Sequence, residues 1–255
     1  MGRTIIAGDY FKEVPFLKNN ERTKRTRMQF GNRAMESFRD AAVAVFGLGG
    51  VGGHCAEALA RLGIGKLILI DNDIISESNI NRQLFATAHT IGKKKTDAAA
   101  ERIRAISDCE LKLFDIFYDG SQTEEIFDEA PDFIIDAIDT VSAKLALIES
   151  AKKAGIPMLS SMGTGDKRDP SLLQITDIKK TSVCPLARVM RRELKKRGIE
   201  ELQVCFSTEQ PERALNLEEA TAGRRDVPSS NPFVPASAGL LLASEAARIL
   251  ASKNV

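Results

Sequence analysis

The chain has 255 residues, of which 43% are hydrophobic and 28% are charged, and its formal net charge is only +1 at pH 7. Length and apolar content allow a large buried core, in either one large domain or two small ones. The balanced charge excludes a global attraction to nucleic acid, so any such attraction must come from local clusters of cations. No apolar run approaches bilayer-spanning length, and the first residues lack a secretory pattern, so we expect a cytoplasmic protein without a membrane partner.

The cysteines and histidines show no pattern of metal or redox chemistry. The four cysteines are widely spread and never form a C-x-x-C pair, which argues against a thiolate zinc site and a redox pair. We therefore expect free thiols. The two histidines, His54 and His89, have no acidic or cysteine partner at metal-ligand spacing. We expect them to cap or pack rather than to bind metal.

The first part of the chain alternates apolar runs with segments of helical spacing. Residues 42–46 (AVAVF) are typical of a buried strand, and residues 52–62 have the spacing of a helix. Residues 66–71 (KLILID) are a second apolar run, so this stretch predicts a β–α–β unit. The pattern continues with predicted strands at residues 111–114, 132–137 and 156–161, and predicted helices at residues 93–106 and 141–155.

This alternation predicts an α/β fold of the Rossmann-like, doubly wound type. Strands joined by crossover helices are parallel, and the helices cover both faces of the sheet, so we expect a mostly parallel sheet. We expect one domain over residues 1–255, with a first part at residues 22–165 and a C-terminal part at residues 166–255.

The C-terminal part predicts an α/β extension with a flexible crossover loop. We expect a strand at residues 171–178, a helix at residues 185–197 and a final helix at residues 236–252. Residues 208–231 are rich in Glu, Arg, Pro, Ser and Gly, so we expect a mobile crossover there. The apolar face of the helix at 185–197 is formed by Leu186, Val189, Met190 and Leu194.

A glycine-rich turn joins the first strand to the first helix. Gly47, Gly49, Gly50 and Gly52 lie there in the pattern G-x-G-G-x-G. In this setting glycine permits a tight turn and lets phosphate oxygens reach amide groups at the positive end of the helix dipole. A purely structural glycine turn is the alternative.

Asp71, at the end of the second strand, has the position of an acidic residue that accepts hydrogen bonds from a ribose. On these features alone a dehydrogenase is favoured. The polar run at residues 78–84 (SNINRQL) changes the interpretation, because the carboxyl ends of parallel strands face the ligand. Hydride transfer has no evident use for Arg82 and for a lysine from residues 93–95, whereas cleaving a triphosphate needs cations to stabilise the leaving pyrophosphate.

Two carboxylates, Asp136 and Asp139, come at the end of the buried strand at residues 132–137. A carboxylate beside a triphosphate suits Mg²⁺, which prefers oxygen ligands. Of the two, we expect Asp136 to be structural.

In residues 47–85, 92–103 and 136–140 the chain resembles the ThiF/ubiquitin-activating enzyme superfamily, and the resemblance extends from about Arg22 to the end. It implies an adenylating enzyme that uses ATP and Mg²⁺, with residues 22–165 as the nucleotide-binding core. Asp71 would bind the ribose and Asp139 would carry Mg²⁺. The resemblance also implies that the glycines cradle phosphate and that the nucleotide contacts include Asp73, Asn79, Arg82, Gln83 and Lys95.

The superfamily also uses an arginine from an N-terminal helix, which is donated across a homodimer to the partner's ATP. The matching stretch here is residues 25–35, and we assign the role to Arg25. With Arg82, Lys95 and Asp139 it completes the expected catalytic set. The neighbouring Arg22, Arg27 and Arg33 are alternatives, as is a plain basic helix face.

Within the superfamily, residues 174–198, 204–211 and 231–250 resemble the tRNA threonylcarbamoyladenosine dehydratase group. That resemblance implies ATP-dependent cyclisation of threonylcarbamoyladenosine in tRNA through an acyl adenylate, with a sulfur-relay protein as a further partner. Sulfur-carrier adenylyltransferases, which activate a C-terminal glycine, usually carry two C-x-x-C pairs, and this chain has none. That activity and an inactive nucleotide-binding scaffold are the alternatives.

Two features of the C-terminal part are left without a catalytic assignment. Cys205 precedes the FSTE segment and Cys184 departs from the group's pattern, but a buried core thiol is the preferred interpretation. The helix at 185–197 also carries a basic face that would bind tRNA phosphates in a salt-sensitive way, with a solvated amphipathic face as the alternative. Its cations are Arg188, Arg191, Arg192, Lys195, Lys196 and Arg197.

Overall fold

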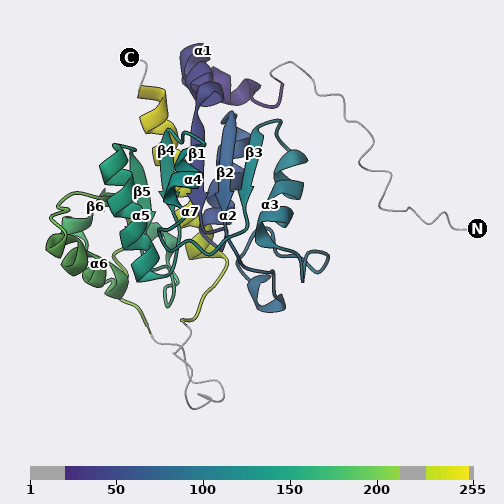
Figure 1. The fold of residues 1–255 in the computed structure, drawn as a ribbon. Helices are drawn as coiled ribbons and strands as arrows, with labels where there is room; N and C mark the ends of the chain where they lie inside the picture. The colour runs from purple at the N-terminus through teal and green to yellow at the C-terminus, as the bar shows by residue number, and fades with distance from the viewer. Residues whose placement is uncertain (1–20, 213–227, 253–255) are drawn as a thin grey trace, which may run out of the picture.

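The computed structural model describes residues 21–212 and 228–252. Its centre is a seven-stranded sheet in the order β3-β2-β1-β4-β5-β7-β6 (Figure 1). Strand β6 runs antiparallel to β7, and every other neighbouring pair is parallel. The predicted mostly parallel sheet is therefore confirmed. The strands are β1 (Ala42–Phe46), β2 (Lys66–Ile70), β3 (Glu110–Phe114), β4 (Phe133–Asp136), β5 (Met158–Ser161), β6 (Leu173–Asp177) and β7 (Gln203–Ser207).

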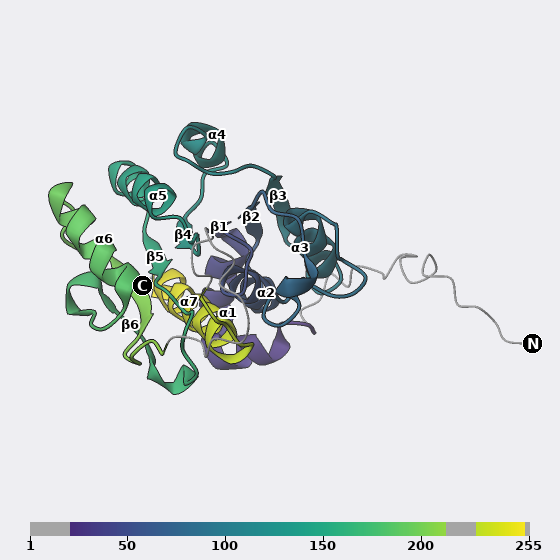
Figure 2. The same cartoon turned by 90° about the horizontal axis from the view of Figure 1, so that it is seen from below.

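Helices cover both faces of this sheet. Seen from below, α4 and α5 lie on one side of the strands, and α1, α2 and α7 lie on the other (Figure 2). The helices are α1 (Lys24–Asp40), α2 (Gly52–Leu62), α3 (Lys95–Arg104), α4 (Thr123–Phe127), α5 (Val141–Ala154), α6 (Pro185–Lys196) and α7 (Phe233–Ser252). The described residues also form the short 3-10 helices η2 (Glu77–Asn79), η3 (Pro170–Leu172) and η4 (Ile178–Lys180).

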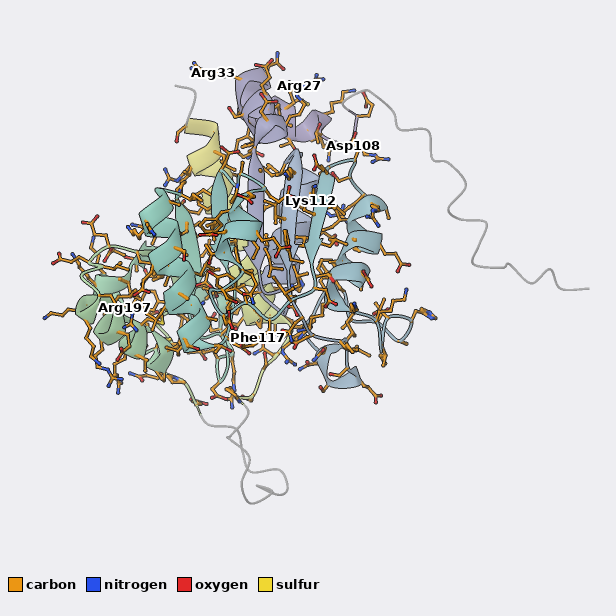
Figure 3. The ribbon with its side chains drawn as sticks, in the orientation of Figure 1. Arg27, Arg33, Asp108, Lys112, Phe117 and Arg197 are labelled. Atoms are coloured by element: carbon orange, nitrogen blue, oxygen red, sulfur yellow. The ribbon has the colours of Figure 1, made fainter. Side chains whose placement is uncertain are left out.

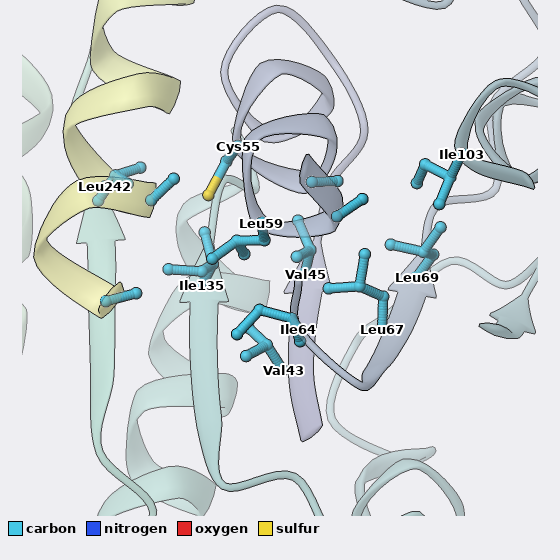
Figure 4. Packing of buried hydrophobic residues seen from close by; sticks show 14 of the residues in the cluster. Val43, Val45, Cys55, Leu59, Ile64, Leu67, Leu69, Ile103, Ile135 and Leu242 are labelled. Carbon is cyan, nitrogen blue, oxygen red and sulfur yellow. The ribbon is translucent and has the colours of Figure 1, made fainter. Parts of the chain in front are cut away.

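The two faces are explained by the alternation of side chains along each strand. Val43 and Val45 of β1 belong to the core cluster under α2 and α7, whereas Ala44 and Phe46 belong to the cluster under α5 and α6. Figure 4 shows the first cluster, in which Leu59 of α2 and Leu242 of α7 point toward the strands. All five β1 residues are buried, as expected for a central strand covered on both sides.

Helix α7 is the one described helix that is long and apolar enough to cross a membrane, by length and composition alone. Half of its apolar window is buried inside the protein, and it packs closely on α2. A Cβ at Gly239 would lie only 2.3 Å from the carbonyl oxygen of Val51, so the two helices touch through backbone. Core packing accounts for the apolar sequence of α7.

Several elements differ from the sequence-based expectations. Strand β7 was not predicted, and α1 is interrupted at Gly31, whose φ of 81° is not helical. The buried face of α6 is formed by Ala187, Met190 and Leu194, while the predicted Leu186 and Val189 are only half-buried. Residues 213–227 of the predicted crossover loop lie outside the described residues, so its mobility stays a prediction.

Candidate active site

A pocket of about 470 Å³ opens at the carboxyl edge of the parallel strands. This is the lower edge in Figure 1, and Figure 3 labels Phe117 there. Residues that follow β1, β2, β3, β4 and β5 all reach it, as expected for the ligand edge of a doubly wound sheet. The predicted site residues that line it are Gly47, Gly49, Gly50, Asp71, Asp73, Asn79, Arg82, Gln83, Lys95 and Asp139.

Two positions of the glycine turn after β1, Gly47 and Gly52, are packed too closely for side chains. Gly47 has φ of 88°, and a Cβ there would lie 2.7 Å from the carbonyl oxygen of Ala137. Gly52 does not line the pocket, and its Cβ would lie 1.8 Å from the carbonyl oxygen of Gly47. Gly52 therefore permits the close approach of α2 to the turn, and its predicted phosphate contact stays a prediction.

The Asp71 carboxylate holds this turn in place. Its Oδ2 accepts a hydrogen bond of 2.6 Å from the Leu48 amide, and its Oδ1 accepts one of 2.8 Å from the Asp73 amide. Burial raises the pKa of Asp71 above its usual value, although the nearby Lys95 ammonium and the two amides act against this rise. A carboxylate has further lone pairs, so these bonds leave room for the predicted ribose contact.

Two cations reach the pocket, and they differ in their partners. The Lys95 ammonium lies 2.6 Å from Asp73 Oδ2 and 3.8 Å from Asp71 Oδ2, and the residue is only 6% exposed. The Arg82 guanidinium donates to the Ser78 carbonyl and the Asn81 side-chain oxygen, and makes no ion pair within the described ranges. Arg82 therefore offers an unneutralised charge to an anion.

A tight turn after β2 positions the neighbouring amides. The Arg82 and Gln83 amides both donate to the Asn79 carbonyl, at 3.1 and 2.9 Å. The Asn79 side chain accepts a 3.1 Å bond from the Ser76 amide and so closes the turn of η2. Asn79, Arg82 and Gln83 are thus held by hydrogen bonds within this turn.

The carboxylates after β4 have different environments. Asp136 is fully buried, and its Oδ2 accepts bonds of 2.9 Å from the Lys144 ammonium and 2.6 Å from the Ser160 hydroxyl. Asp139 is exposed in the pocket and is contacted by the Thr140 hydroxyl. Asp136 thus lies in a buried ion pair, in keeping with the structural role that we predicted for it, and Asp139 is free to meet a ligand.

The donor set at Asp139 fits a magnesium ion that arrives with a triphosphate. No group of three or more His, Cys, Asp or Glu is arranged to hold a metal in the parts of the chain that the structure describes. Mg²⁺ in such sites uses one or two carboxylates together with substrate phosphates and water, so a single exposed carboxylate is sufficient.

Comparison with known proteins agrees with this geometry. The model of the ThiF family matches residues 23–255. The chain belongs to the ThiF family. A tRNA threonylcarbamoyladenosine dehydratase of Bacillus subtilis is 40% identical over 228 residues, which cover 86% of this chain and 90% of that protein.

Solved structures of ThiF-family proteins show the same fold. The crystal structure of Escherichia coli tRNA N6-threonylcarbamoyladenosine dehydratase in complex with AMP has a TM-score of 0.84 and is 33% identical, covering 92% of this chain and 95% of that chain. The same Escherichia coli protein in complex with ATP has a TM-score of 0.82 at 33% identity, with the same coverage. This resemblance confirms the predicted Rossmann-like class.

Arg25 does not line the pocket of its own chain. Helix α1 lies at the end of the sheet opposite to the pocket, and Figure 3 shows Arg27 and Arg33 of α1 at the top and Phe117 at the bottom. The role predicted for Arg25 therefore requires a second chain, and it stays a prediction.

Several pocket residues were missed by the sequence analysis. Ile116, Phe117 and Tyr118 follow β3 and line the pocket, and the rule that ligands meet the carboxyl ends of strands applies to them as well. Thr164 follows β5, so the same rule applies to it. Ser230 and Pro235 reach the pocket from the C-terminal part. No sequence signal connects these two residues to the site, because only the packing of α7 on α2 brings them there.

The cysteines are free thiols, as predicted, within the described residues. Cys205 and Cys184 are buried in the two core clusters. Burial raises the pKa of Cys205 to about 12, although Lys167 acts against this rise. A thiol that stays protonated is a poor nucleophile, so Cys205 fits a packing role.

Proposed function

We propose that this ThiF-family chain is an ATP-dependent tRNA threonylcarbamoyladenosine dehydratase. The observation that carries the proposal is the pocket in which the glycine turn, Arg82, Lys95 and Asp139 meet at one edge of the sheet. The proposal is supported by the Bacillus subtilis relative of that name, of which the chain covers 90%, and by the Escherichia coli dehydratase structures with AMP and ATP.

The chemistry explains why such a pocket is needed. The threonyl carboxylate of the modified base is a poor electrophile at neutral pH. Transfer of AMP from ATP to a carboxylate oxygen releases pyrophosphate and leaves a mixed anhydride. The carbamoyl group then attacks the acyl carbon, AMP departs, and the ring closes with net loss of one water from the base. The protein has to position the groups and stabilise charge, with no covalent enzyme intermediate.

The pocket residues fit these tasks. We assign phosphate contacts to the glycine turn, and to Arg82 and Lys95 the stabilisation of charge on the leaving pyrophosphate. We assign Asp139 as the carboxylate that would hold Mg²⁺, an ion that supplies positive charge to phosphate oxygens. Asp71 keeps the turn in shape through the Leu48 amide and would accept bonds from the ribose.

The assembly and location are further parts of the proposal. We propose a homodimer in which α1 of each chain supplies Arg25 to the pocket of its partner. A sulfur-relay protein is the further partner that the resemblance implies. We place the enzyme in the cytoplasm, where its tRNA substrate and ATP are found.

Mass spectrometry of threonylcarbamoyl-modified tRNA incubated with the protein and Mg-ATP tests the proposal. We expect loss of one water from the modified nucleoside, with ATP converted to AMP and pyrophosphate. The Asp139→Ala variant should fold and leave both tRNA and ATP unchanged. Unchanged tRNA with the wild-type protein, together with adenylation of a Gly-Gly-ended carrier, would select the sulfur-carrier activity instead.

A further inference from the structure

Helix α6 presents a face of cations to solvent. Arg188, Arg192 and Lys195 are exposed. At 3.6 residues per turn they lie within about 60° of one another around the helix axis, so they form one stripe, which we call the α6 stripe. The opposite side of the helix is buried through Ala187, Met190 and Leu194.

The only acid of α6 does not neutralise this stripe. Glu193 pairs with Arg192 at 3.1 Å, but also with Lys196 at 2.9 Å and with Arg197 at 3.1 Å. Arg188 and Lys195 make no ion pair in the part of the chain that the structure describes. The α6 stripe therefore carries an excess of positive charge.

Helix α6 begins next to the pocket. A Cβ at Gly163 would lie 3.7 Å from the Cys184 sulfur and 3.8 Å from the Leu186 Cβ, so α6 begins beside Gly163. The next residue, Thr164, lines the pocket. The basic helix thus starts at the rim of the pocket. The exposed cations of α1 lie at the other end of the sheet (Figure 1).

A groove of about 480 Å³ lies between α5 and α6. Val141 and Ser142 line the groove, and they directly follow Asp139 and Thr140, which line the pocket. Its lining mixes apolar side chains with charged ones. Both of its acids are paired, since Glu149 and Glu193 bind Arg197. The lining residues are Val141, Ser142, Leu145, Ala146, Glu149, Val189, Arg192, Glu193 and Arg197.

We propose that the α6 stripe and the α5–α6 groove bind the tRNA strand next to the nucleotide that reacts in the pocket, an inference that rests on the proposed function. Cations without carboxylate partners gain most from phosphates, because they release counterions from the nucleic acid and break no ion pair of their own. The groove beside them offers apolar side chains and the guanidinium groups of Arg192 and Arg197, on which the unstacked bases of a single-stranded loop can pack. An acidic protein would match the stripe but has no bases to place in the groove.

The Arg188→Glu/Lys195→Glu double variant tests the proposal, because neither side chain holds an internal ion pair. Its matched control is Lys152→Glu/Lys153→Glu, which makes the same charge change on exposed lysines at the far end of α5. That end lies about 17 Å along the helix from Val141, at 1.5 Å per residue. Both proteins are first checked for unchanged thermal unfolding.

We measure the Kd for modified tRNA at several salt concentrations, the KM and kcat for tRNA, and the Kd for ATP. The α6 double variant should bind tRNA at least about tenfold more weakly, with a salt slope reduced by about 1 to 2. Its KM for tRNA should rise while its Kd for ATP stays unchanged, and the control should behave like the wild type. Equal tRNA affinity in both double variants would overturn the proposal.

The binding measurement separates this inference from the proposed function. If the wild type binds tRNA through α6 but does not convert the modified base, the proposed activity is wrong and the assignment of α6 as a tRNA-binding surface is confirmed. If the wild type converts the base and the α6 double variant does so with a normal KM for tRNA, the assignment of α6 as a tRNA-binding surface is wrong and the proposed activity is confirmed. Normal tRNA binding with lost binding of an acidic protein partner would assign the stripe to a protein and overturn our proposal.

Discussion

Arg82 and Lys95 line the same pocket, but their charges are balanced differently. The Lys95 ammonium is nearly buried and pairs with Asp73 at 2.6 Å, whereas the Arg82 guanidinium donates to neutral oxygens. To bind an entering triphosphate, Lys95 must give up its ion pair with Asp73, whereas Arg82 has no ion pair to give up. We infer that Arg82 supplies most of the new charge stabilisation, because its favourable interaction with the anion is not offset by a lost ion pair.

Replacing Arg82 by Gln should lower the rate of ATP cleavage by about 10²- to 10³-fold, the usual effect of removing one donor that stabilises developing charge. The fold should be unchanged, since among the described residues the Arg82 side chain donates hydrogen bonds only to the neighbouring Ser78 and Asn81. AMP formation is measured with saturating tRNA. Lys94→Gln is the control, because Lys94 is exposed and pairs with Asp115 outside the pocket. Wild-type rates in the Arg82 variant would remove Arg82 from the reaction.

The Asp136–Lys144 pair is the most deeply buried ion pair in the described structure, with both side chains fully inaccessible. Replacing Lys144 by Met leaves a buried carboxylate without its cation, so we expect a loss of about 3–5 kcal/mol in the free energy of unfolding. Urea denaturation measures it. Adding Asp136→Asn should recover part of the loss, because the uncompensated charge is gone. If the Lys144→Met variant lost less than about 1 kcal/mol in the free energy of unfolding, the Asp136–Lys144 pair would behave like an exposed ion pair, which would contradict its burial.

At the scale of elements, the sequence predicted those strands and site residues whose pattern lies within one continuous segment of the chain. The apolar runs predicted β1, β2 and β4, and the residues that follow them supplied the glycine turn, Asp71 and Asp139 of the pocket. Strand β7 was missed because its place between β5 and β6 depends on pairing with distant strands. Ser230 and Pro235 were missed as pocket residues for a similar reason, since only tertiary packing brings the start of α7 to the site.

Glu57 joins α2 to α3 and makes their packing dependent on pH. Its buried carboxylate accepts 2.8 Å bonds from the Arg102 and Arg61 side chains. Burial alone would raise the pKa of Glu57, but the hydrogen bonds and charges of the two arginines outweigh it, so the pKa is lowered. A lowered pKa means that the stabilisation is present above the unfolded pKa of Glu, about 4.3, and is lost as the pH falls through the folded value.

The Glu57→Gln variant should therefore unfold more easily than the wild type at pH 7, by about 1–3 kcal/mol for charged hydrogen bonds. The difference should shrink as the pH falls below about 4. Urea unfolding at several pH values measures this trend. Glu101→Gln is the control, since Glu101 makes an exposed pair with Lys93 that contributes about 0–1 kcal/mol. A difference that stays constant with pH would contradict the role of ionised Glu57.

At the scale of the whole molecule, the sheet separates the pocket from the arginines of α1. The pocket occupies the carboxyl edge of the strands, and α1 with its exposed arginines lies at the opposite edge (Figure 1). The seven strands form one sheet, and the single domain stays a prediction. A chain built in this way cannot bring Arg25 to its own ATP without moving α1 across the sheet. If Arg25 acts in the reaction, it must act on another chain.

This arrangement predicts complementation between defective subunits. An Arg25→Ala chain keeps a complete pocket but donates no arginine, and a Lys95→Ala chain donates Arg25 to a partner but has a defective pocket. When equal amounts exchange subunits, half of the dimers are mixed and one of their two pockets is complete, so turnover should recover to about one quarter of the wild-type value. Dehydration of modified tRNA is measured for each variant alone and after mixing, with the dimer verified by light scattering. Two inactive variants that stay inactive when mixed would show that Arg25 does not act across the dimer.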